Sequence, residues 1–101
     1  MCGLTGFWQR NSATTDFRPV AQAMADRIAH RGPDDSGVWT DEQAGLALAH
    51  RRLSIVDLSA AGHQPMLSGS GRYVLAYNGE IYNHLDLRQE LEAAGSAPPW
   101  R

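Results

Sequence analysis

The residue with the clearest chemical potential is Cys2, the only cysteine of the chain, which directly follows Met1. Removal of Met1 would place a thiol and a free α-amine on one residue. An α-amino group titrates near pH ~8 and a cysteine thiol near ~8.5, so the amine can accept the thiol proton at neutral pH, directly or through a water. This is the N-terminal form of a nucleophile with its own base. By itself, Cys2 is better explained as a small buried residue at the start of a strand. The segments that follow make the interpretation as a nucleophile the better one.

Two segments near the start of the chain are expected to position this thiol. Gly3 to Trp8 is short and rich in apolar residues, which predicts a strand with Cys2 at its beginning. Pro19 to Ala29 predicts a helix, because proline suits a first helical turn and apolar residues recur at every fourth position. We expect this apolar stripe to face the core. Its members are Val20, Met24 and Ile28.

The middle of the chain predicts a loop followed by strands. His30 to Gly37 contains two glycines, a proline and two acids, which indicates a loop whose shape is set by its backbone. Strands are expected at Gly37 to Thr40 and at Gly45 to Arg51, and Leu53 to Val56 continues in extended form. Ser59 to Gly71 is again loop-like.

The last part of the chain predicts one more strand and one more helix. Tyr73 to Tyr77 is a near-continuous apolar run, which suits a strand covered on both faces, and the pair Asn78-Gly79 favours a turn after it. Asn83 is a good N-cap and Gly95 a good C′ residue for a helix. The apolar stripe of that helix would be Leu87, Leu91 and Ala94. This order of elements predicts an α+β fold with helices on a mostly antiparallel sheet.

Length and composition narrow the class of protein. A chain of 101 residues is enough for one modest domain with one core. The net charge of −2 provides no field that would attract nucleic acid or an acidic membrane surface. A lone cysteine cannot form an internal disulfide, and no apolar run approaches the roughly 18 residues of a membrane span. We therefore expect a cytoplasmic protein that binds neither nucleic acid nor membrane.

Four short motifs occur along the chain. They are Met1-Cys2-Gly3 with Gly6-Phe7; His30-Arg31-Gly32-Pro33-Asp34 with Ser36-Gly37; His50-Arg51-Arg52-Leu53-Ser54-Ile55-Val56-Asp57 with Gly62-His63-Gln64-Pro65; and Tyr77-Asn78-Gly79-Glu80-Ile81-Tyr82-Asn83. In this order and at these spacings, the motifs resemble class II glutamine amidotransferases over essentially the whole chain. The third and fourth motifs favour the glutaminase domain of glutamine-hydrolysing asparagine synthetases over other branches of the family.

The resemblance implies an N-terminal-nucleophile hydrolase fold, an αββα sandwich of two β-sheets between helical layers, incomplete in this chain. It implies hydrolysis of the side-chain amide of L-glutamine and delivery of ammonia to a synthetase domain, which amidates aspartate with ATP and magnesium. We therefore interpret residues 1–101 as the N-terminal part of a type 2 glutamine amidotransferase domain, and expect the rest of that domain and the synthetase domain to be absent. We expect no cofactor in this part, and a homodimer for the full-length protein.

The resemblance also assigns roles to individual residues. Cys2 would be the nucleophile, with the Asn78 side-chain amide and the Gly79 backbone N–H as oxyanion donors. Such donors suit this chemistry, because thiolate attack on an amide creates an oxyanion. Arg52 would grip the α-carboxylate of glutamine, for which a planar guanidinium is well matched. The remaining substrate-binding residues would be Leu53, Ile55, Val56 and Glu80.

Simpler interpretations stay open for several of these residues. Asn78-Gly79 is also a common turn, and Leu53 and Ile55 also fit a core. Arg51 and Arg52 could be solvated surface charges, although in a strand they would point in opposite directions. We expect the loop from Arg31 to Gly37 to be structural and neither of its acids to be catalytic. The acids are Asp34 and Asp35.

Other chemistries find little support in the sequence. The four histidines have no close metal-ligand spacing, no Walker-type glycine loop is present, and no serine lies in a nucleophile elbow. The chain ends at Ser96 to Arg101, where family members continue into a Ser-Asp-Thr-Glu-like segment that holds the glutamine α-amine. Two alternatives therefore remain: a catalytically silent partial domain that serves binding or assembly, and an amidotransferase of a related synthetase with a different acceptor.

Overall fold

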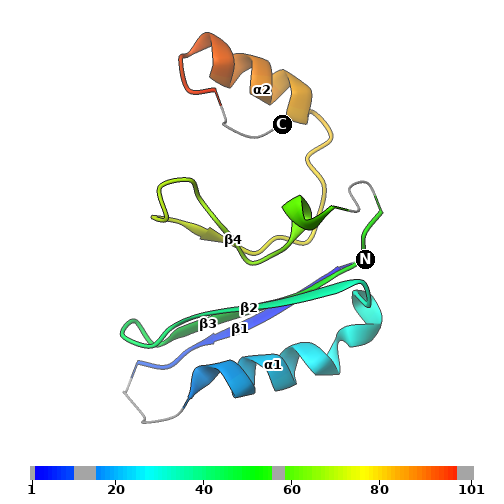
Figure 1. The fold of residues 1–101 in the computed structure, drawn as a ribbon, viewed down its shortest axis with the longest axis vertical. Helices are drawn as coiled ribbons and strands as arrows, with labels where there is room; N and C mark the ends of the chain where they lie inside the picture. Colours follow the sequence, from blue (N-terminus) through cyan, green and yellow to red (C-terminus); the bar gives the residue numbers. More distant parts are fainter. Residues whose placement is uncertain (1, 11–15, 56–58, 98–101) are drawn as a thin grey trace.

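The computed structural model describes residues 2–10, 16–55 and 59–97 (Figure 1). In chain order the elements are β1 (Gly3–Trp8), α1 (Phe17–Arg27), η1 (Ala29–Arg31), β2 (Asp35–Asp41), β3 (Leu46–Arg52), η2 (Ala60–Gly62), β4 (Met66–Leu67), β5 (Val74–Leu75) and α2 (His84–Ala93). The predicted first strand agrees with β1, and the predicted helix and the two middle strands agree with α1, β2 and β3 to within a few residues. Among the described residues, neither α-helix is long and apolar enough to cross a membrane.

A three-stranded antiparallel sheet forms the centre of the fold. Strand β3 lies between β1 and β2, with His50 paired to Leu4 on one side and to Gly37 on the other. Because side chains alternate along a strand, the even-numbered residues of β3 share one face with these partners, and the odd-numbered residues share the other. Helix α1 covers only the second of these faces (Figure 1).

The core lies between α1 and this second face. Phe17, Ala21 and Ala25 of α1 are buried together with Ala47 and Ala49 of β3. Small side chains on both elements allow the helix to lie close to the sheet. At one end of the core the rings of Phe7 and Phe17 meet edge to face, with centroids 5.2 Å apart.

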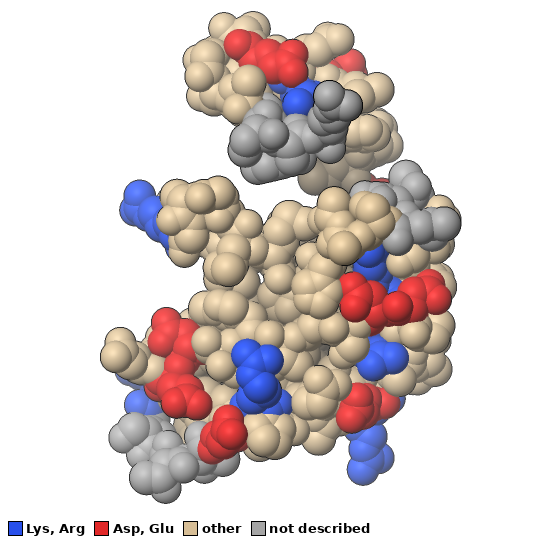
Figure 2. All heavy atoms as spheres, viewed as in Figure 1, with Lys and Arg blue, Asp and Glu red and all other residues tan. Residues whose placement is uncertain are grey.

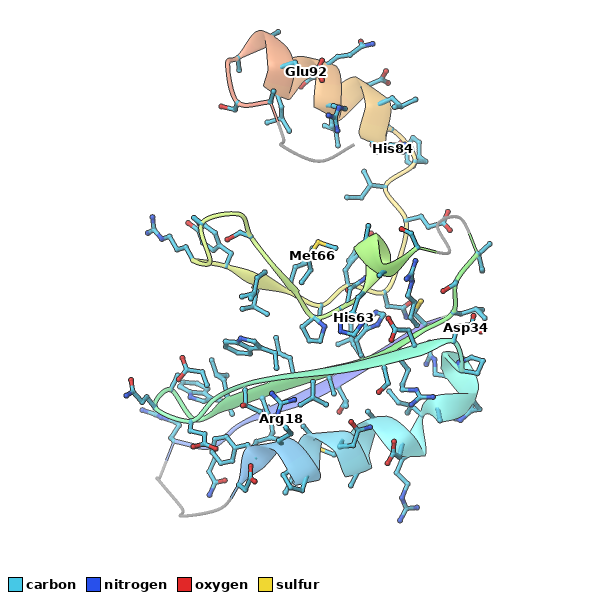
Figure 3. The ribbon with its side chains drawn as sticks, in the orientation of Figure 1. Arg18, Asp34, His63, Met66, His84 and Glu92 are labelled. Carbon is cyan, nitrogen blue, oxygen red and sulfur yellow. The ribbon has the colours of Figure 1, made fainter. Side chains whose placement is uncertain are left out.

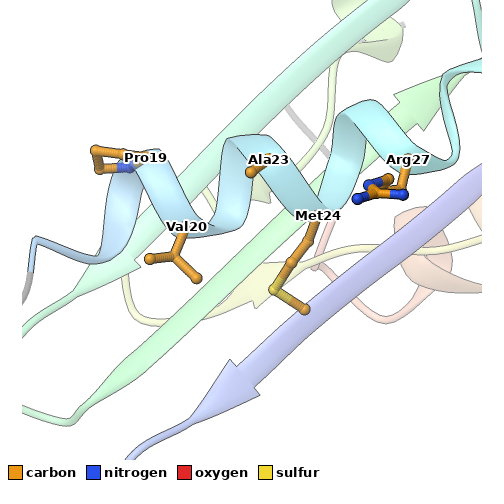
Figure 4. Close-up of a pocket in the computed structure, with 5 residues that line it drawn as sticks. All are labelled: Pro19, Val20, Ala23, Met24 and Arg27. Atoms are coloured by element: carbon orange, nitrogen blue, oxygen red, sulfur yellow. The ribbon is translucent and has the colours of Figure 1, made fainter.

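The predicted apolar stripe of α1 is wrong by one residue position. Val20 is 42% exposed, and with Met24 it lines a shallow hollow of about 450 Å³ on the outer surface of the helix (Figure 4). Of the predicted stripe, Ile28 lies against the sheet, where it packs beside Gly3. The buried stripe also repeats every four residues, so periodicity does not distinguish the two. Close packing against the alanines of β3 favours the stripe with the smaller residues.

The opposite face of the sheet is only partly covered. Leu4 and Trp8 of β1 lie on this face and are 44% and 64% exposed. Near the Arg52 end, the segment that follows η2 crosses over Gly37, where a Cβ atom would lie 2.8 Å from His63 Nε2. In Figure 3, His63 lies between the sheet and the β4 segment. Glycine at position 37 therefore permits this segment to lie against the sheet.

The predicted strand from Tyr73 to Tyr77 is only partly formed. The structure forms a short strand at Val74–Leu75, which pairs with Met66–Leu67 inside the region predicted as a loop. Leu75 is 54% exposed and Tyr73 is 64% exposed, so the strand is not covered on both faces. The apolar run predicted burial, but within the described residues no second layer packs on this hairpin.

Helix α2 stands apart from the sheet (Figure 1). It begins after Asn83 as predicted, although the Asn83 side chain makes no capping hydrogen bond, and it ends before Gly95, whose φ of +79° is the left-handed conformation expected at a C′ position. The helix buries none of its residues, and Leu87 and Leu91 are 39% and 44% exposed. Acidic and basic side chains are interspersed over the visible surface (Figure 2). Two helices with antiparallel sheets are compatible with part of an α+β domain.

Candidate active site

A cavity of about 540 Å³ opens beside Cys2, where the start of β1 meets the end of β3 and the segment after β5. Its lining residues are Cys2, Arg52, Leu53, Ser54, Ile55, Gly62, Gln64, Asn78, Gly79, Glu80, Ile81, Tyr82 and His84. These come from four stretches of chain: Cys2, residues 52–55, residues 62–64 and residues 78–84. Every residue predicted for the site lines this cavity, except Val56, which lies outside the described residues.

The Cys2 thiol is held at the base of this cavity by the backbone of Leu53. The Leu53 N–H donates to Cys2 Sγ at 3.3 Å, and the thiol is 3.7 Å from the Leu53 carbonyl oxygen, to which it can donate. Cys2 is half-buried, so its sulfur is both positioned and accessible from the cavity.

Arg52 and Arg51 point to opposite faces of β3, as predicted. Arg51 lies on the α1 side, where Nε donates to the Gly32 carbonyl oxygen at 2.9 Å and Nη1 lies 4.0 Å from Asp26 Oδ1. Arg52 is only 8% exposed and lies on the cavity side, where Nη1 donates to the Ser59 carbonyl oxygen at 2.6 Å. The interpretation of Arg52 as a solvated surface charge is therefore wrong.

Helix η2 lies directly against the Arg52 guanidinium. A Cβ atom at Gly62 would collide with Arg52 Nη2 and would lie 2.5 Å from Cζ. Glycine at this position therefore allows the turn to approach the guanidinium. The Ser59 carbonyl at the start of the turn and Gly62 at its end together restrict where Arg52 can lie.

Asp35 and His63 form a second link between this turn and the sheet. His63 Nδ1 donates to Asp35 Oδ2 at 2.6 Å, and Asp35 of β2 lies opposite Arg52 of β3 in the strand register. Burial alone would raise the pKa of Asp35, but the hydrogen bonds from His63 and the Ser36 amide, with the charges of His63 and Arg52, lower it. Sequence reasoning missed this pair, since 28 residues separate its members and nothing in the local pattern of either predicts the contact.

The loop beneath the site is fixed by hydrogen bonds. The Asp34 carboxylate accepts from the Ser54 N–H at 2.8 Å, and the Asp34 N–H donates to the Arg52 carbonyl oxygen at 3.0 Å. At Gly32 a Cβ atom would collide with the Arg51 carbonyl and lie 2.5 Å from the Arg52 nitrogen. These contacts support the prediction that the loop has a structural role.

The remaining predicted residues lie on the open side of the cavity. Asn78 is half-buried, and Gly79 and Glu80 are exposed. Ile55 is 68% exposed, so the alternative that its side chain belongs to the core is wrong. At Gly79 a Cβ atom would lie 2.7 Å from the Tyr77 hydroxyl, so the absence of a side chain permits this turn to close on the tyrosine.

The cavity thus collects three kinds of functional group. Cys2 supplies a thiol, Arg52 a buried guanidinium, and Asn78 with Gly79 supplies uncharged N–H donors. A thiol can attack a carboxamide, N–H donors can stabilise the resulting oxyanion, and a guanidinium can bind a carboxylate elsewhere on the same substrate. The arrangement suits hydrolysis of a small amide that carries a carboxylate.

Comparison with known proteins agrees with this chemistry. The glutamine amidotransferase domain family matches residues 1–98. Asparagine synthetase [glutamine-hydrolyzing] 1 of Bacillus subtilis is 41% identical over 97 residues, which are 94% of this chain and 15% of that protein. Asparagine synthetase B [glutamine-hydrolyzing] of Escherichia coli is 43% identical over 90 residues, which are 89% of this chain and 16% of that protein. The chain therefore spans about 15% of the length of these relatives.

No solved structure gave a significant match to the chain. The assignment therefore depends on the sequence match and on the cavity, which agree. The match covers nearly all of the chain, and the predicted site residues that the structure describes all line one cavity. The chain belongs to the glutamine amidotransferase domain family.

Proposed function

We propose that this chain supplies the glutaminase site of a glutamine-hydrolysing asparagine synthetase. The observation that carries the proposal is the single cavity that brings Cys2 together with Arg52, Asn78 and Gly79. The relatives named above support asparagine synthetase as the branch of the family. L-Glutamine is the proposed substrate.

In the proposed reaction, the Cys2 thiolate attacks the side-chain carbonyl carbon of glutamine. The carbonyl electrons move onto oxygen, and Asn78 and Gly79 donate hydrogen bonds to this oxyanion. With Met1 removed, the α-amine of Cys2 takes the thiol proton and passes it to the departing nitrogen, which leaves as ammonia. Water then attacks the thioester, releases glutamate and regenerates the thiol. Arg52 holds the α-carboxylate throughout.

We further propose that the two layers described here belong to an αββα sandwich. The sheet face opposite α1 supports this, because Leu4 and Trp8 on that face are exposed and an apolar sheet face needs a covering layer. The exposed apolar residues of the β4–β5 hairpin would belong to the second sheet.

ATP and magnesium, with aspartate as the acceptor, belong in this proposal to a synthetase domain. No group of three His, Cys, Asp or Glu side chains within the described residues could hold a metal ion, and no step assigned to this chain involves either ligand. A cytoplasmic location and a homodimeric assembly of the whole protein remain part of the proposal.

The proposal is tested by comparing two nitrogen sources in the intact gene product. We expect Cys2→Ala to abolish glutamine-dependent asparagine formation and glutamate release while ammonia-dependent synthesis continues, because ammonia does not need the thiol. Asparagine formation from glutamine at the wild-type rate in Cys2→Ala would refute the nucleophile. Loss of both activities would indicate a structural role for Cys2, and release of glutamate without asparagine would indicate another acceptor.

A further inference from the structure

The backbone immediately before Asn78 is held by two side chains from distant parts of the chain. The Tyr77 N–H donates to Gln64 Oε1 at 2.6 Å, and the Tyr77 carbonyl oxygen lies 3.0 Å from His50 Nε2. Strand β5 already ends at Leu75, so no β-ladder fixes the backbone at this point. The two side chains therefore bind the backbone N–H and the backbone carbonyl of Tyr77, which in a strand would bind a neighbouring strand.

His50 provides a rigid support for this contact. It is 1% exposed and lies on the central strand β3, between Leu4 and Gly37 of the neighbouring strands. Because a carbonyl oxygen can only accept, Nε2 must carry the hydrogen in this contact. Burial lowers the pKa of His50, which favours the neutral imidazole with this hydrogen on Nε2.

Gln64 ties the same peptide to the turn beside Arg52. It follows His63, whose Nδ1 donates to Asp35 Oδ2 at 2.6 Å, and its own carbonyl oxygen lies against Gly37. On the far side of Asn78, the Tyr77 ring packs against Gly79, where a Cβ atom would lie 2.7 Å from the Tyr77 hydroxyl. The turn that carries the two donors is therefore restrained on both sides of Asn78.

Building on the proposed function, we propose that His50 and Gln64 are positioning residues for the oxyanion donors. By holding the Tyr77 peptide between them, they determine where the Asn78 amide and the Gly79 N–H lie relative to the Cys2 thiol. Neither residue needs to contact the reacting atoms for this role. The three residues of the support are His50, Gln64 and Tyr77.

The expected kinetic effect follows from when the oxyanion exists. Donors aimed at an oxyanion act in the transition state and contribute little to binding of the uncharged amide, so their displacement lowers kcat and leaves KM nearly unchanged. Removal of an oxyanion donor costs about 10²- to 10³-fold in kcat, and a misplacement of about 1 Å can cost about 10²-fold. We expect a loss of about 10- to 100-fold for a displaced turn.

The experiment measures glutamate release by the intact gene product. His50→Met and Gln64→Met remove the donor and the acceptor with side chains of similar length, whereas His50→Gln retains an N–H donor at the position of Nε2. We expect both methionine variants to lose kcat with KM for glutamine within about 3-fold of wild type, and His50→Gln to recover most of the loss. In the double methionine variant, the combined loss should be smaller than the product of the two single losses, because both act on one peptide.

Alkylation of Cys2 by iodoacetamide separates positioning from general disruption of the site. Displacement of iodide forms no oxyanion, so a positioning role predicts wild-type alkylation rates in the variants that hydrolyse glutamine slowly. Wild-type kcat in both methionine variants, or parallel loss of hydrolysis and alkylation in both, would overturn the inference while leaving the proposed function intact. A wild-type protein that alkylates at Cys2 but never releases glutamate would overturn the proposed function and this inference with it.

Discussion

The close contact between Gly62 and Arg52 allows Arg52, the proposed anchor of the glutamine α-carboxylate, to be displaced without removing its charge. Ordinary van der Waals contact for a Cβ atom begins near 3.4 Å, whereas a Cβ at Gly62 would lie 2.5 Å from Arg52 Cζ and closer still to Nη2. In Gly62→Ala the guanidinium must therefore retreat by at least about 0.9 Å, which is the difference between these distances at Cζ, and Nη2 must move further. The backbone at Gly62 is not in the left-handed region, so alanine is compatible with the turn itself.

The magnitude follows from the hydrogen bonds that the displacement would weaken. A hydrogen bond to a charged group contributes about 1.5–3 kcal/mol, and a tenfold change in an equilibrium constant corresponds to about 1.4 kcal/mol. We therefore expect Gly62→Ala to raise KM for glutamine about 10- to 100-fold. The proposed contact with the α-carboxylate would be the same in the ground state and the transition state, so kcat should change little.

Gly69→Ala is the matched control. Gly69 lies in the exposed turn between β4 and β5, and no atom lies within 4 Å of a Cβ placed there. We expect Gly69→Ala to keep the wild-type KM, with both variants assayed for glutamate release over a range of glutamine concentrations. A Gly62→Ala protein that unfolds at the same urea concentration as Gly69→Ala and still has the wild-type KM would refute the assignment of Arg52.

Three further changes test the anchor and the fold. Arg52→Ala should raise KM for glutamine at least as much as displacement does, and a fall confined to kcat would show that this arginine is not the anchor. Ala25→Leu should destabilise the fold by about 1–3 kcal/mol in urea unfolding, because Ala25 is fully buried. Ala23→Leu, on the exposed surface of α1, should leave the stability unchanged. Equal effects of the two substitutions would contradict the observed orientation of the helix. Burial lowers the pKa of His50, so as pH falls below about 6.5 the unfolded chain takes up a proton at His50 before the folded protein does. The free energy of unfolding should therefore decline by at most about 1.4 kcal/mol per pH unit until the folded protein also titrates. A free energy of unfolding that stays constant between pH 7 and 5, as in His50→Gln, would contradict this.

The sequence predicted elements that local pattern determines. The apolar run at Gly3–Trp8, the turn-forming residues before β2 and the C′ glycine at Gly95 all set local conformation, and the structure agrees with each. The opposite orientations of Arg51 and Arg52 followed from strand alternation alone. These features need no knowledge of what packs against them.

Features that depend on tertiary packing were not predictable in this way. The choice between the Val20 and Ala21 stripes of α1 depends on the alanines of β3, which a helical pattern does not contain. The apolar run at Tyr73–Tyr77 predicted a fully covered strand, but coverage depends on a second layer. The link between His63 and Asp35, like the contacts of Tyr77 with His50 and Gln64, joins residues that are at least 13 positions apart. Family motifs identified the residues of the cavity, while their supports required the structure.

The proposed glutaminase site is best tested by the intact mass of the purified protein before and after exposure to a glutamine-like electrophile. We expect a protein without Met1 that gains one adduct, on Cys2, and we expect free L-glutamine to suppress this adduct because both occupy the cavity beside Arg52 and Asn78. A retained Met1, or labelling of Cys2 that glutamine does not slow, would contradict the claim that this cavity is a working glutaminase site.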